Sequence, residues 1–454
     1  MPTEDQPSSA WSRFKHWLRS QIKPHEVPAV AIAFVYFLCV LAAYYVIRPV
    51  RDQLSAAVGS TALPIFYTAT FIATLSLTPV FGALVARYPR RVFVPLVYAF
   101  FIVGMIAFIP LFRMQDAIGA RVLGSVFFVW VSVFNLFVVA VFWSLMADLF
   151  DAEQAHRLFP VVALGGAIGA IAGPLLTKSL NAFVGVAGLL VVSSLLLGVA
   201  IVCIYGLSNW SRKYPVAGDE RRDERIIGGN FLAGAIETFK SPLMRRIAIL
   251  MLLGDAVGTV IYAFLIDYNG ATHATRGERI DFSANVDLWT NILQAVFQIF
   301  ATRTLMMRFG PAAALALDGL VKAVMLAGFA LFAGPWIAAV AVVTRASAYG
   351  IFKPAADSLY TQVDAETRYK TKNFIDTSVW RFGDVAVNGS LNGLRLLGAT
   401  PPMLALMTTV AAMSSAWIGW QTARSFATGA ALKAGRTDKT GPGDAQTLAA
   451  QNRE

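Results

Sequence analysis

The sequence is poor in charge. Only 14% of its 454 residues are Asp, Glu, Lys or Arg, whereas 57% are hydrophobic. This balance, with a mean hydropathy of +0.60, excludes a soluble globular protein. Apolar runs of about 20 residues recur along nearly the whole chain, and each is long enough to cross a bilayer as a helix. Because a lipid-embedded backbone must satisfy its own hydrogen bonds, the sequence predicts an all-α membrane protein with about twelve spans.

Cysteine and histidine are also scarce, with two Cys and four His. Cys39 and Cys203 fall inside predicted spans, so we expect small buried side chains and no disulfide framework. The four His lie outside the spans, and no metal-ligand or nucleophile–base spacing occurs, which argues against an enzyme and against a metal or other cofactor. There is no Gly-rich Lys-Ser/Thr loop, so we do not expect this chain to drive pumping by ATP hydrolysis.

The scarce charges are unevenly distributed, with a net charge of +11. If the N-terminus is inside, most Lys and Arg fall in inward-facing segments, as the positive-inside rule requires. A basic surface that faces anionic lipid explains this excess without a nucleic-acid partner. We therefore expect a monomeric, multi-pass protein of the bacterial inner membrane with both termini in the cytoplasm.

One polar, charge-rich connection at 208–246 interrupts the apolar runs near the middle of the chain. It separates a predicted N-terminal six-helix bundle at 27–207 from a C-terminal one at 247–423. Cytoplasmic tails are predicted at 1–26 and 424–454, and the first tail contains an amphipathic stretch that suits a helix lying on the membrane surface.

Short matches suggest that one half repeats the other. Asp151-Ala152-Glu153 follows the fourth span, and Asp364-Ala365-Glu366 follows the tenth. A tight basic turn that contains Arg87, between the second and third spans, resembles the loop motif of the major facilitator superfamily, without the acidic residue usual there. Two six-helix halves with an inward linker and local repeats also describe the architecture of that superfamily. We expect these acidic residues and Arg87 to contribute to gating.

Arg48, Arg51 and Asp52 close the first apolar run and share one helix face. Basic side chains at a helix end often extend to the lipid headgroups, which is the simplest explanation of such a cluster. Two features weaken it: the arginines are predicted at the outward end, and a carboxylate shares their face. Because the planar guanidinium binds phosphate or carboxylate through two hydrogen bonds, the cluster predicts an anionic substrate.

Other polar residues inside predicted spans extend the candidate binding set. Arg345 has no opposite charge three or four residues away, so it needs a partner from another helix or from a ligand. Asn291 and Gln294 belong to a polar stripe along the eighth span, which favours a cavity-facing position. Arg381 and Asn388 lie on the polar face of the eleventh span.

Carboxylates within the spans are candidates for coupling transport to protons, because a buried carboxylate can exchange a proton near neutral pH. Asp255 and Asp384, with Asp52 of the cluster above, fit this role. Asp318 and Lys322 are four residues apart and can neutralise each other, so a structural ion pair is favoured over coupling.

The fifth span contains small residues four apart, at Gly165, Gly169 and Gly173, followed by Pro174. Such spacing lets two helices approach closely, and the proline is expected to bend the helix. Tight packing is the favoured interpretation, and a hinge would require the same packing.

The charged cluster also resembles a known motif. Tyr44-x-x-x-Arg48-Pro49-Val50-Arg51-Asp52 is similar to the end of the first span in the nucleotide (ATP/ADP) exchange translocases of plastids and intracellular bacteria, with Arg51 at the position of their functionally important lysine. The run from Tyr349 to Gly383, which includes Asp364-x-Glu366-x-Arg368 and Arg381-Phe382-Gly383, is similar to the family around spans ten and eleven. The resemblance implies the same fold and site and an NTP/NDP antiport activity.

Several positions depart from that family. Lys353 stands where an aspartate is usual, Ala356 and Asp384 replace lysines, and Val131 or a neighbour replaces a glutamate of the fourth span. Because these charges are changed or reversed, we expect the fold and the location of the site to be shared with that family more than its nucleotide specificity. We interpret the chain as a secondary transporter working by alternating access on an anionic solute. The alternatives are a proton-coupled transporter of a muropeptide, siderophore or other organic anion, a membrane enzyme, and a sensor or scaffold built on a transporter fold.

Overall fold

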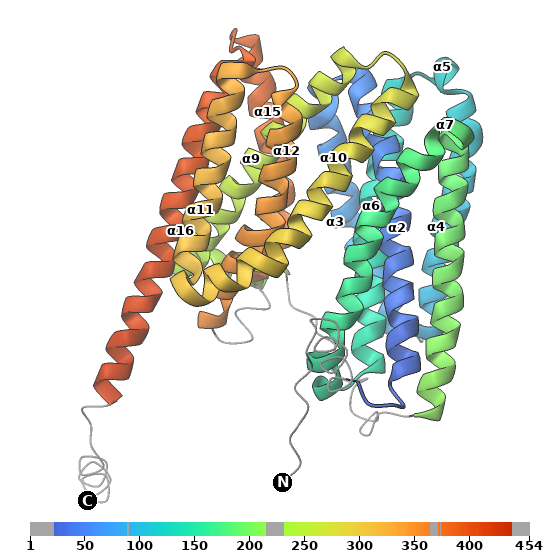
Figure 1. Cartoon of the computed structure of the whole chain (residues 1–454), viewed down its shortest axis with the longest axis horizontal. Helices are drawn as coiled ribbons and strands as arrows, with labels where there is room; N and C mark the ends of the chain where they lie inside the picture. Colours follow the sequence, from blue (N-terminus) through green and yellow to red (C-terminus); the bar gives the residue numbers. More distant parts are fainter. Residues whose placement is uncertain (1–21, 89, 215–230, 364–370, 373, 438–454) are drawn as a thin grey trace, which may run out of the picture. The chain divides into compact units, whose positions relative to one another are not determined.

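A computed structural model describes residues 22–88, 90–214, 231–363, 371–372 and 374–437 (Figure 1). Within these ranges every regular element is a helix, which confirms the predicted all-α fold. The predicted amphipathic stretch of the N-terminal tail and the acidic residues Asp364 and Glu366 lie outside the described residues.

The helices follow one another with short connections. The first series consists of α2 (Val27–Val58), η1 (Ser60–Ala62), α3 (Leu63–Arg87), α4 (Arg90–Arg113), α5 (Gln115–Ile118), α6 (Ala120–Leu149) and α7 (Ala152–Lys213). The second consists of α8 (Phe231–Lys240), α9 (Pro242–Thr272), α10 (Arg276–Val296), η3 (Phe297–Thr302), α11 (Arg303–Phe332), α12 (Trp336–Ser347), η4 (Ala348–Phe352), α13 (Lys353–Leu359), η5 (Tyr360–Gln362), η6 (Ile375–Val379), α15 (Trp380–Leu396) and α16 (Pro401–Thr437).

Eight helical segments of the described chain are long and apolar enough to cross a membrane. Two of them, of 61 and 57 residues, are far longer than the roughly 20 residues that one crossing needs. Each contains one glycine with non-helical backbone angles, Gly185 with φ 59° in α7 and Gly310 with φ 75° in α11. Each long segment is therefore two spans. The helical stretches 336–359 and 375–396 supply two more, which agrees with the predicted twelve.

Contacts divide the chain into two compact units that do not follow chain order. Unit 1 contains residues 1–228 and 263–292, and unit 2 contains residues 229–262 and 293–454. The end of α9 and most of α10 therefore belong to unit 1. The predicted halves at 27–207 and 247–423 were defined by their order along the chain, not by contacts. Their boundaries therefore remain a prediction.

In unit 1, α7 doubles back at Gly185 and packs along α2 (Figure 1). Both ends of α7 reach the start of α2, because Gln154 donates to Glu26 at 3.1 Å and the Trp210 indole donates to the carbonyl of His25 at 3.0 Å. The turn at Gly185 favours glycine because its φ is positive.

The predicted small-residue stripe lies where α7 meets α2. A Cβ on Gly165 would lie 2.3 Å from the Phe34 carbonyl oxygen, and one on Gly173 would lie 2.5 Å from Tyr45 Cβ. These glycines therefore let the two backbones touch. Pro174 lies within helical backbone, and the non-helical angles within α7 occur at Gly185.

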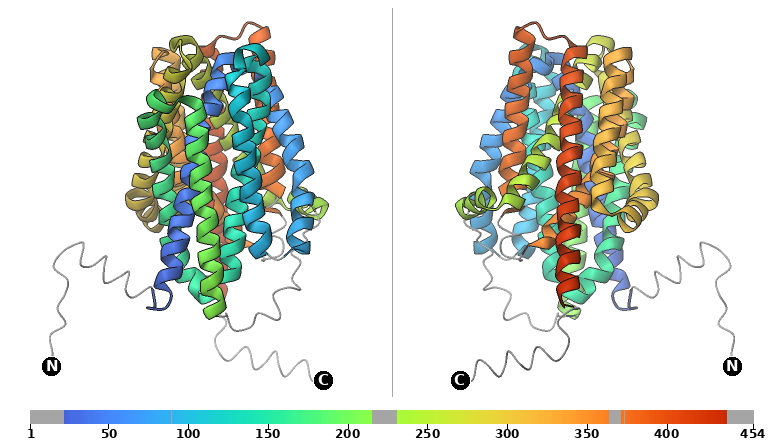
Figure 2. Two further views of the ribbon diagram at one scale, coloured as in Figure 1. Left: turned by 90° about the vertical axis from the view of Figure 1, so that its right-hand side faces the viewer. Right: turned by 90° about the vertical axis from the view of Figure 1, so that its left-hand side faces the viewer.

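In unit 2, α11 packs along α16 (Figure 2). This packing also depends on small residues, since a Cβ on Gly319 would lie 2.5 Å from Ala416 Cβ. The buried apolar core of unit 2 includes Met251, Leu315 and Phe352.

Candidate functional site

The cluster predicted from the first apolar run lies inside a helix. The sequence placed Arg48, Arg51 and Asp52 at the far edge of the first span, but α2 continues beyond them to Val58 and ends at Gly59. Arg51 is 9% exposed and Asp52 is 5% exposed. Burial to this degree is inconsistent with side chains that extend into lipid headgroups. The charges are held within unit 1.

Arg51 and Asp52 form a buried ion pair. The Nε and Nη2 atoms of Arg51 donate to Asp52 Oδ1 at 2.9 and 2.7 Å. The Arg51 guanidinium also lies over the Phe128 ring, 4.8 Å from its centroid, where the face of the aromatic ring attracts a cation. Asp52 therefore balances the charge of its neighbour on the same helix.

Arg48 has a different partner, on a helix far away in sequence. Its Nη1 lies 3.3 Å from Asp287 Oδ1 of α10, and the two side chains are 13% and 1% exposed. The Arg48 Nε has no hydrogen-bond partner among the described residues. The ring of Tyr45 lies 5.6 Å from the Arg48 guanidinium. The structure thus brings together a basic residue that the sequence predicted and an acidic one that it missed.

The sequence analysis missed Asp287 because its polar stripe on the eighth span began at Asn291, whereas α10 begins at Arg276. One signal could have revealed it. Asp281, Asp287 and Asn291 lie within one third of the circumference of a helix, so the polar stripe extends further back than the sequence interpretation placed it.

This polar side of α10 is tied to other helices of unit 1. Asn291, 7% exposed, donates to the carbonyl of Ala170 at 2.6 Å. Asn181 of α7 donates to Asp281 at 2.8 Å and to the carbonyl of Gly277 at 3.0 Å. The predicted Gln294 lies further along α10 and is half-buried. Asn291 therefore bonds to the α7 backbone.

Unit 2 contains a second group of predicted residues, on α9 and α15. Asp384 accepts a hydrogen bond from Thr259 Oγ1 at 3.0 Å and lies 3.6 Å from Arg381 Nη1. Asp255 accepts a hydrogen bond from the Trp380 indole. A Cβ on Gly383, the residue before Asp384, would lie 3.4 Å from Asp255 Oδ2, so Asp255 lies against α15. Asn388, on the same face of α15, donates to the backbone carbonyl of Asp384 at 2.8 Å.

The pair Asp318–Lys322 is buried in unit 2. Lys322 Nζ lies 2.8 Å from Asp318 Oδ2, with side-chain exposures of 4% and 1%. Ser347 donates to Asp318 Oδ1 at 2.5 Å, and the Lys322 ammonium lies 4.8 Å from the centre of the Phe352 ring. The spacing of four residues thus gives an ion pair within α11. Arg345 lies two residues before Ser347 on α12 and is half-buried.

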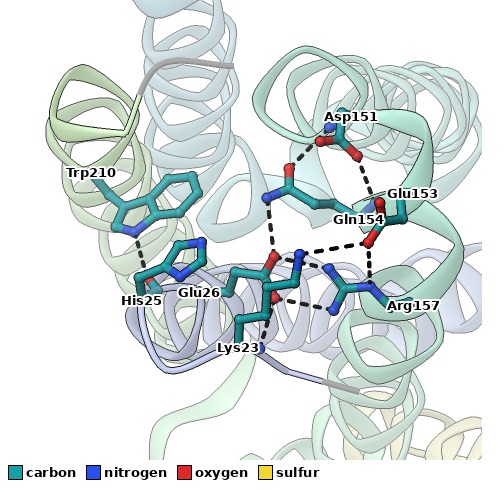
Figure 3. A network of polar contacts seen from close by, with 8 residues as sticks. All are labelled: Lys23, His25, Glu26, Asp151, Glu153, Gln154, Arg157 and Trp210. Carbon is teal, nitrogen blue, oxygen red and sulfur yellow. Dashed lines mark hydrogen bonds and ion pairs between the residues drawn. The ribbon is translucent and has the colours of Figure 1, made fainter. Parts of the chain in front are cut away.

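A third polar network joins the start of α2 to the start of α7 (Figure 3). Glu26 is fully buried, and its two carboxylate oxygens accept hydrogen bonds from Arg157 at 3.0 and 3.2 Å. Burial raises the pKa of Glu26, but the hydrogen bonds from Arg157, the Lys23 backbone and Gln154 lower it more, so the pKa lies below its usual value.

The predicted gating residues Asp151 and Glu153 are part of this network. Asp151 caps α7 by accepting from the Gln154 backbone at 2.7 Å, and the side-chain oxygen of Gln154 accepts from the Asp151 backbone at 3.1 Å, which completes a capping box. Glu153 is mostly exposed and lies 3.6 Å from Arg157. Arg87, at the end of α3, is exposed. The sequence interpretation missed Glu26 and Arg157, although Arg157 follows Glu153 at a spacing of four residues.

Comparison with known proteins extends these observations. A family model described as Major Facilitator Superfamily matches residues 32–383. A comparison with curated proteins gives no match.

Among solved structures, the chain is similar to a bacterial homologue of the human lysosomal transporter Spinster, at 14% identity and a TM-score of 0.60, over 89% of this chain and 98% of that one. It is also similar to the nucleoside transporter NupG, at 13% identity and a TM-score of 0.61, over 88% and 99% of the two chains. A third similar structure is a bacterial homologue of the iron transporter ferroportin, at 16% identity and a TM-score of 0.61, over 88% and 98%. At such identities the similarity shows a shared fold.

Proposed function

The chain belongs to the Major Facilitator Superfamily and is a multi-pass membrane transporter, and we propose that it moves an anionic organic solute by secondary active transport with alternating access. The cargo is a small molecule, and the proposed binding group is the Arg48 guanidinium of unit 1. The protein is proposed to act as a monomer in the bacterial inner membrane with both termini in the cytoplasm.

The observation that carries this proposal is the position of Arg48. Its side chain is withdrawn from lipid headgroups but remains 13% exposed, and it faces a carboxylate on another helix. A guanidinium in a low-dielectric setting attracts phosphate and carboxylate strongly, and its planar fork can donate two hydrogen bonds to one anion. The buried Nε atom has no hydrogen-bond partner among the described residues, so the hydrogen bonds of this guanidinium are incompletely satisfied.

Phosphorylated solutes, nucleotides among them, are the first cargo class to test. The support is the similarity of the motif around Arg48 and Arg51 to that of the nucleotide exchange translocases. The buried pair Arg51–Asp52 leaves Arg48 as the cation more open to a ligand. Other organic anions fit the same chemistry.

The test is a thermal-stability screen of the purified full-length protein with ATP, ADP, glucose 6-phosphate and a muramyl dipeptide, each added alone. Cargo that binds the folded state raises the melting temperature, and a charge-dependent effect shrinks with added salt. Arg48→Gln should remove the response. Arg308→Gln is the matched control, because Arg308 is an exposed arginine of α11.

Uptake of the stabilising solute into proteoliposomes then tests transport itself. A stabilisation that Arg48→Gln leaves unchanged would refute the assigned site. Stabilisation without any uptake or exchange would favour a sensor over a transporter.

A second candidate function, proton-coupled transport, is favoured by the carboxylates of unit 2. Asp255 lies against α15 beside Gly383, the residue before Asp384, and Arg381 Nη1 lies 3.6 Å from Asp384. Two carboxylates that share one nearby cation inside a helix bundle are less costly when one of them is protonated. Under this proposal an inward proton gradient accelerates uptake in the parent. Asp255→Asn would abolish that acceleration while solute exchange without a gradient continues.

A further inference from the structure

We propose that Asp287 is an internal counterion that anionic cargo displaces from Arg48. Cargo binding would then break the ion pair that joins α10 to α2 within unit 1. The inference rests on the proposed function. It assigns to Asp287 a positioning role, in which the residue competes with cargo for the same guanidinium.

Arg51 and Arg48 are paired in different ways. Arg51 makes two hydrogen bonds to Asp52, its immediate neighbour on α2. Arg48 lies 3.3 Å from Asp287, and that contact joins two helices that are distant in sequence. Because both residues of the Arg51–Asp52 pair belong to α2, a movement of α2 relative to another helix carries them together. The Arg48–Asp287 pair joins α2 to α10, so it is the one of these two pairs that a relative movement of α2 and α10 would separate.

An anion can reach the Arg48 guanidinium more easily than the Asp287 carboxylate. A guanidinium carries five N–H donors on a planar fork, and a carboxylate at one edge leaves donors at the other. The Arg48 side chain is 13% exposed, whereas Asp287 is 1% exposed. An incoming anion can therefore approach the arginine before the aspartate leaves. An exchange of this kind avoids a stage in which a buried charge has no partner, which would be strongly unfavourable.

Other contacts also hold α10 against its neighbours in unit 1. The contacts from Asn181 and Asn291 are hydrogen bonds from neutral amides, which an anion does not compete for as it does for a guanidinium. At the first turn of α10 the exposed Arg276 also pairs with Asp116 of α5, whereas the ion pair of Arg48 and Asp287 is a buried, anion-sensitive tie between α2 and α10. Loss of this tie on cargo binding should loosen α10 in unit 1.

The same pairing predicts how the carrier behaves without cargo. With Asp287 present, Arg48 is neutralised by the chain itself, so the binding site can change its exposure with no cargo bound. In Asp287→Asn the guanidinium has no carboxylate from α10, and reorientation without cargo leaves a buried charge unbalanced. We therefore expect this variant to carry out exchange but to lose net uptake.

The matched control is Asp281→Asn. Asp281 lies on the same side of α10 but bonds to the neutral amide of Asn181 at 2.8 Å. Both variants remove one carboxylate from one helix, and only one removes the counterion of Arg48.

The experiment uses the purified full-length chain and ATP, glucose 6-phosphate and citrate as separate probes. For a probe that stabilises the parent, Asp287→Asn should bind about tenfold more tightly, since it lacks the internal competitor. Asp281→Asn should bind as the parent does. In proteoliposomes, Asp287→Asn should keep counterflow of the probe and lose net uptake, whereas Asp281→Asn keeps both.

A second measurement needs no variant. Hydrogen exchange of the parent should become faster in residues 276–291 when the probe is added, because one tie of α10 is released. Equal affinity and equal net uptake in the two variants, or slower exchange in this segment on probe binding, would overturn the role of Asp287 and leave the anion site standing. A parent that responds to none of the three anions would overturn the proposed function together with this inference.

Discussion

Gly169 of α7 lies directly against the backbone of Leu38 in α2: a Cβ built on the glycine would be 2.2 Å from the Leu38 carbonyl oxygen. Backbone atoms cannot move aside as the end of a flexible side chain can. The two helices must therefore separate if any larger residue occupies this position.

Gly169→Ala should accordingly destabilise the protein by about 1–3 kcal/mol, as overpacking typically does. The control is Gly198→Ala in the same helix, where nothing lies within 4 Å of an added Cβ. That substitution should be neutral or stabilise by up to about 1 kcal/mol, because alanine favours helix more than glycine. Thermal unfolding of the detergent-purified variants measures both. Equal melting temperatures for the two variants would contradict the close packing of α2 on α7.

Arg51→Ala should act mainly on stability. It leaves the Asp52 carboxylate, 5% exposed, without the guanidinium that donates to it. Removal of one member of a buried ion pair typically costs about 3–5 kcal/mol. Arg51→Ala combined with Asp52→Asn should recover much of that loss, because no charge is left unbalanced. If the single and double variants melt alike, charge balance is not what Arg51 supplies.

Lys322→Met should destabilise unit 2 by a similar mechanism and by about 3–5 kcal/mol, since it leaves Asp318 buried and charged. Adding Asp318→Asn should restore stability, with the amide oxygen still available to the hydroxyl of Ser347. Solute uptake by the double variant separates the two roles that the sequence left open. Uptake near the parental rate indicates a structural pair, and loss of uptake in a stable protein indicates coupling.

Glu26 gives a pH dependence with a definite sign. Its pKa in the folded protein lies below the ordinary value of 4.5, because Arg157, the Lys23 backbone and Gln154 outweigh the opposing effect of burial. The stability from its ionised form is therefore fully present above about pH 4.5 and is lost as the pH falls through the lowered pKa.

Glu26→Gln should therefore be less stable than the parent at pH 7, and the difference should shrink below pH 4.5. Glu153→Gln serves as the control, since Glu153 is mostly exposed and its ion pairs with Lys23 and Arg157 are both 3.6 Å long. Thermal unfolding between pH 3 and 7 checks the prediction. A gap between parent and Glu26→Gln that widens on acidification would contradict the assigned sign.

The sequence predicted the parts of the fold that depend on local composition. Apolar runs of membrane length, the glycines of the fifth span and the pair Asp318–Lys322 are all readable from spacing along one helix. The same reasoning found Arg48 but placed it at a helix end, because the polarity of the chain rises after Ile47. The helix continues to Val58 because the cluster is buried by other helices, which is not a property of its own residues.

The sequence by itself determined the environment of the protein, which is a lipid bilayer. With so few charges and such long apolar runs, the chain must form its backbone hydrogen bonds within helices that cross a membrane. The partners of the buried charges were decided only by the tertiary structure. Asp287 neutralises Arg48, which lies 239 residues away in the sequence, and Glu26 neutralises Arg157, which lies 131 residues away. Helical periodicity fixes neighbours three or four residues apart, whereas an ion pair between distant helices depends on which faces pack together.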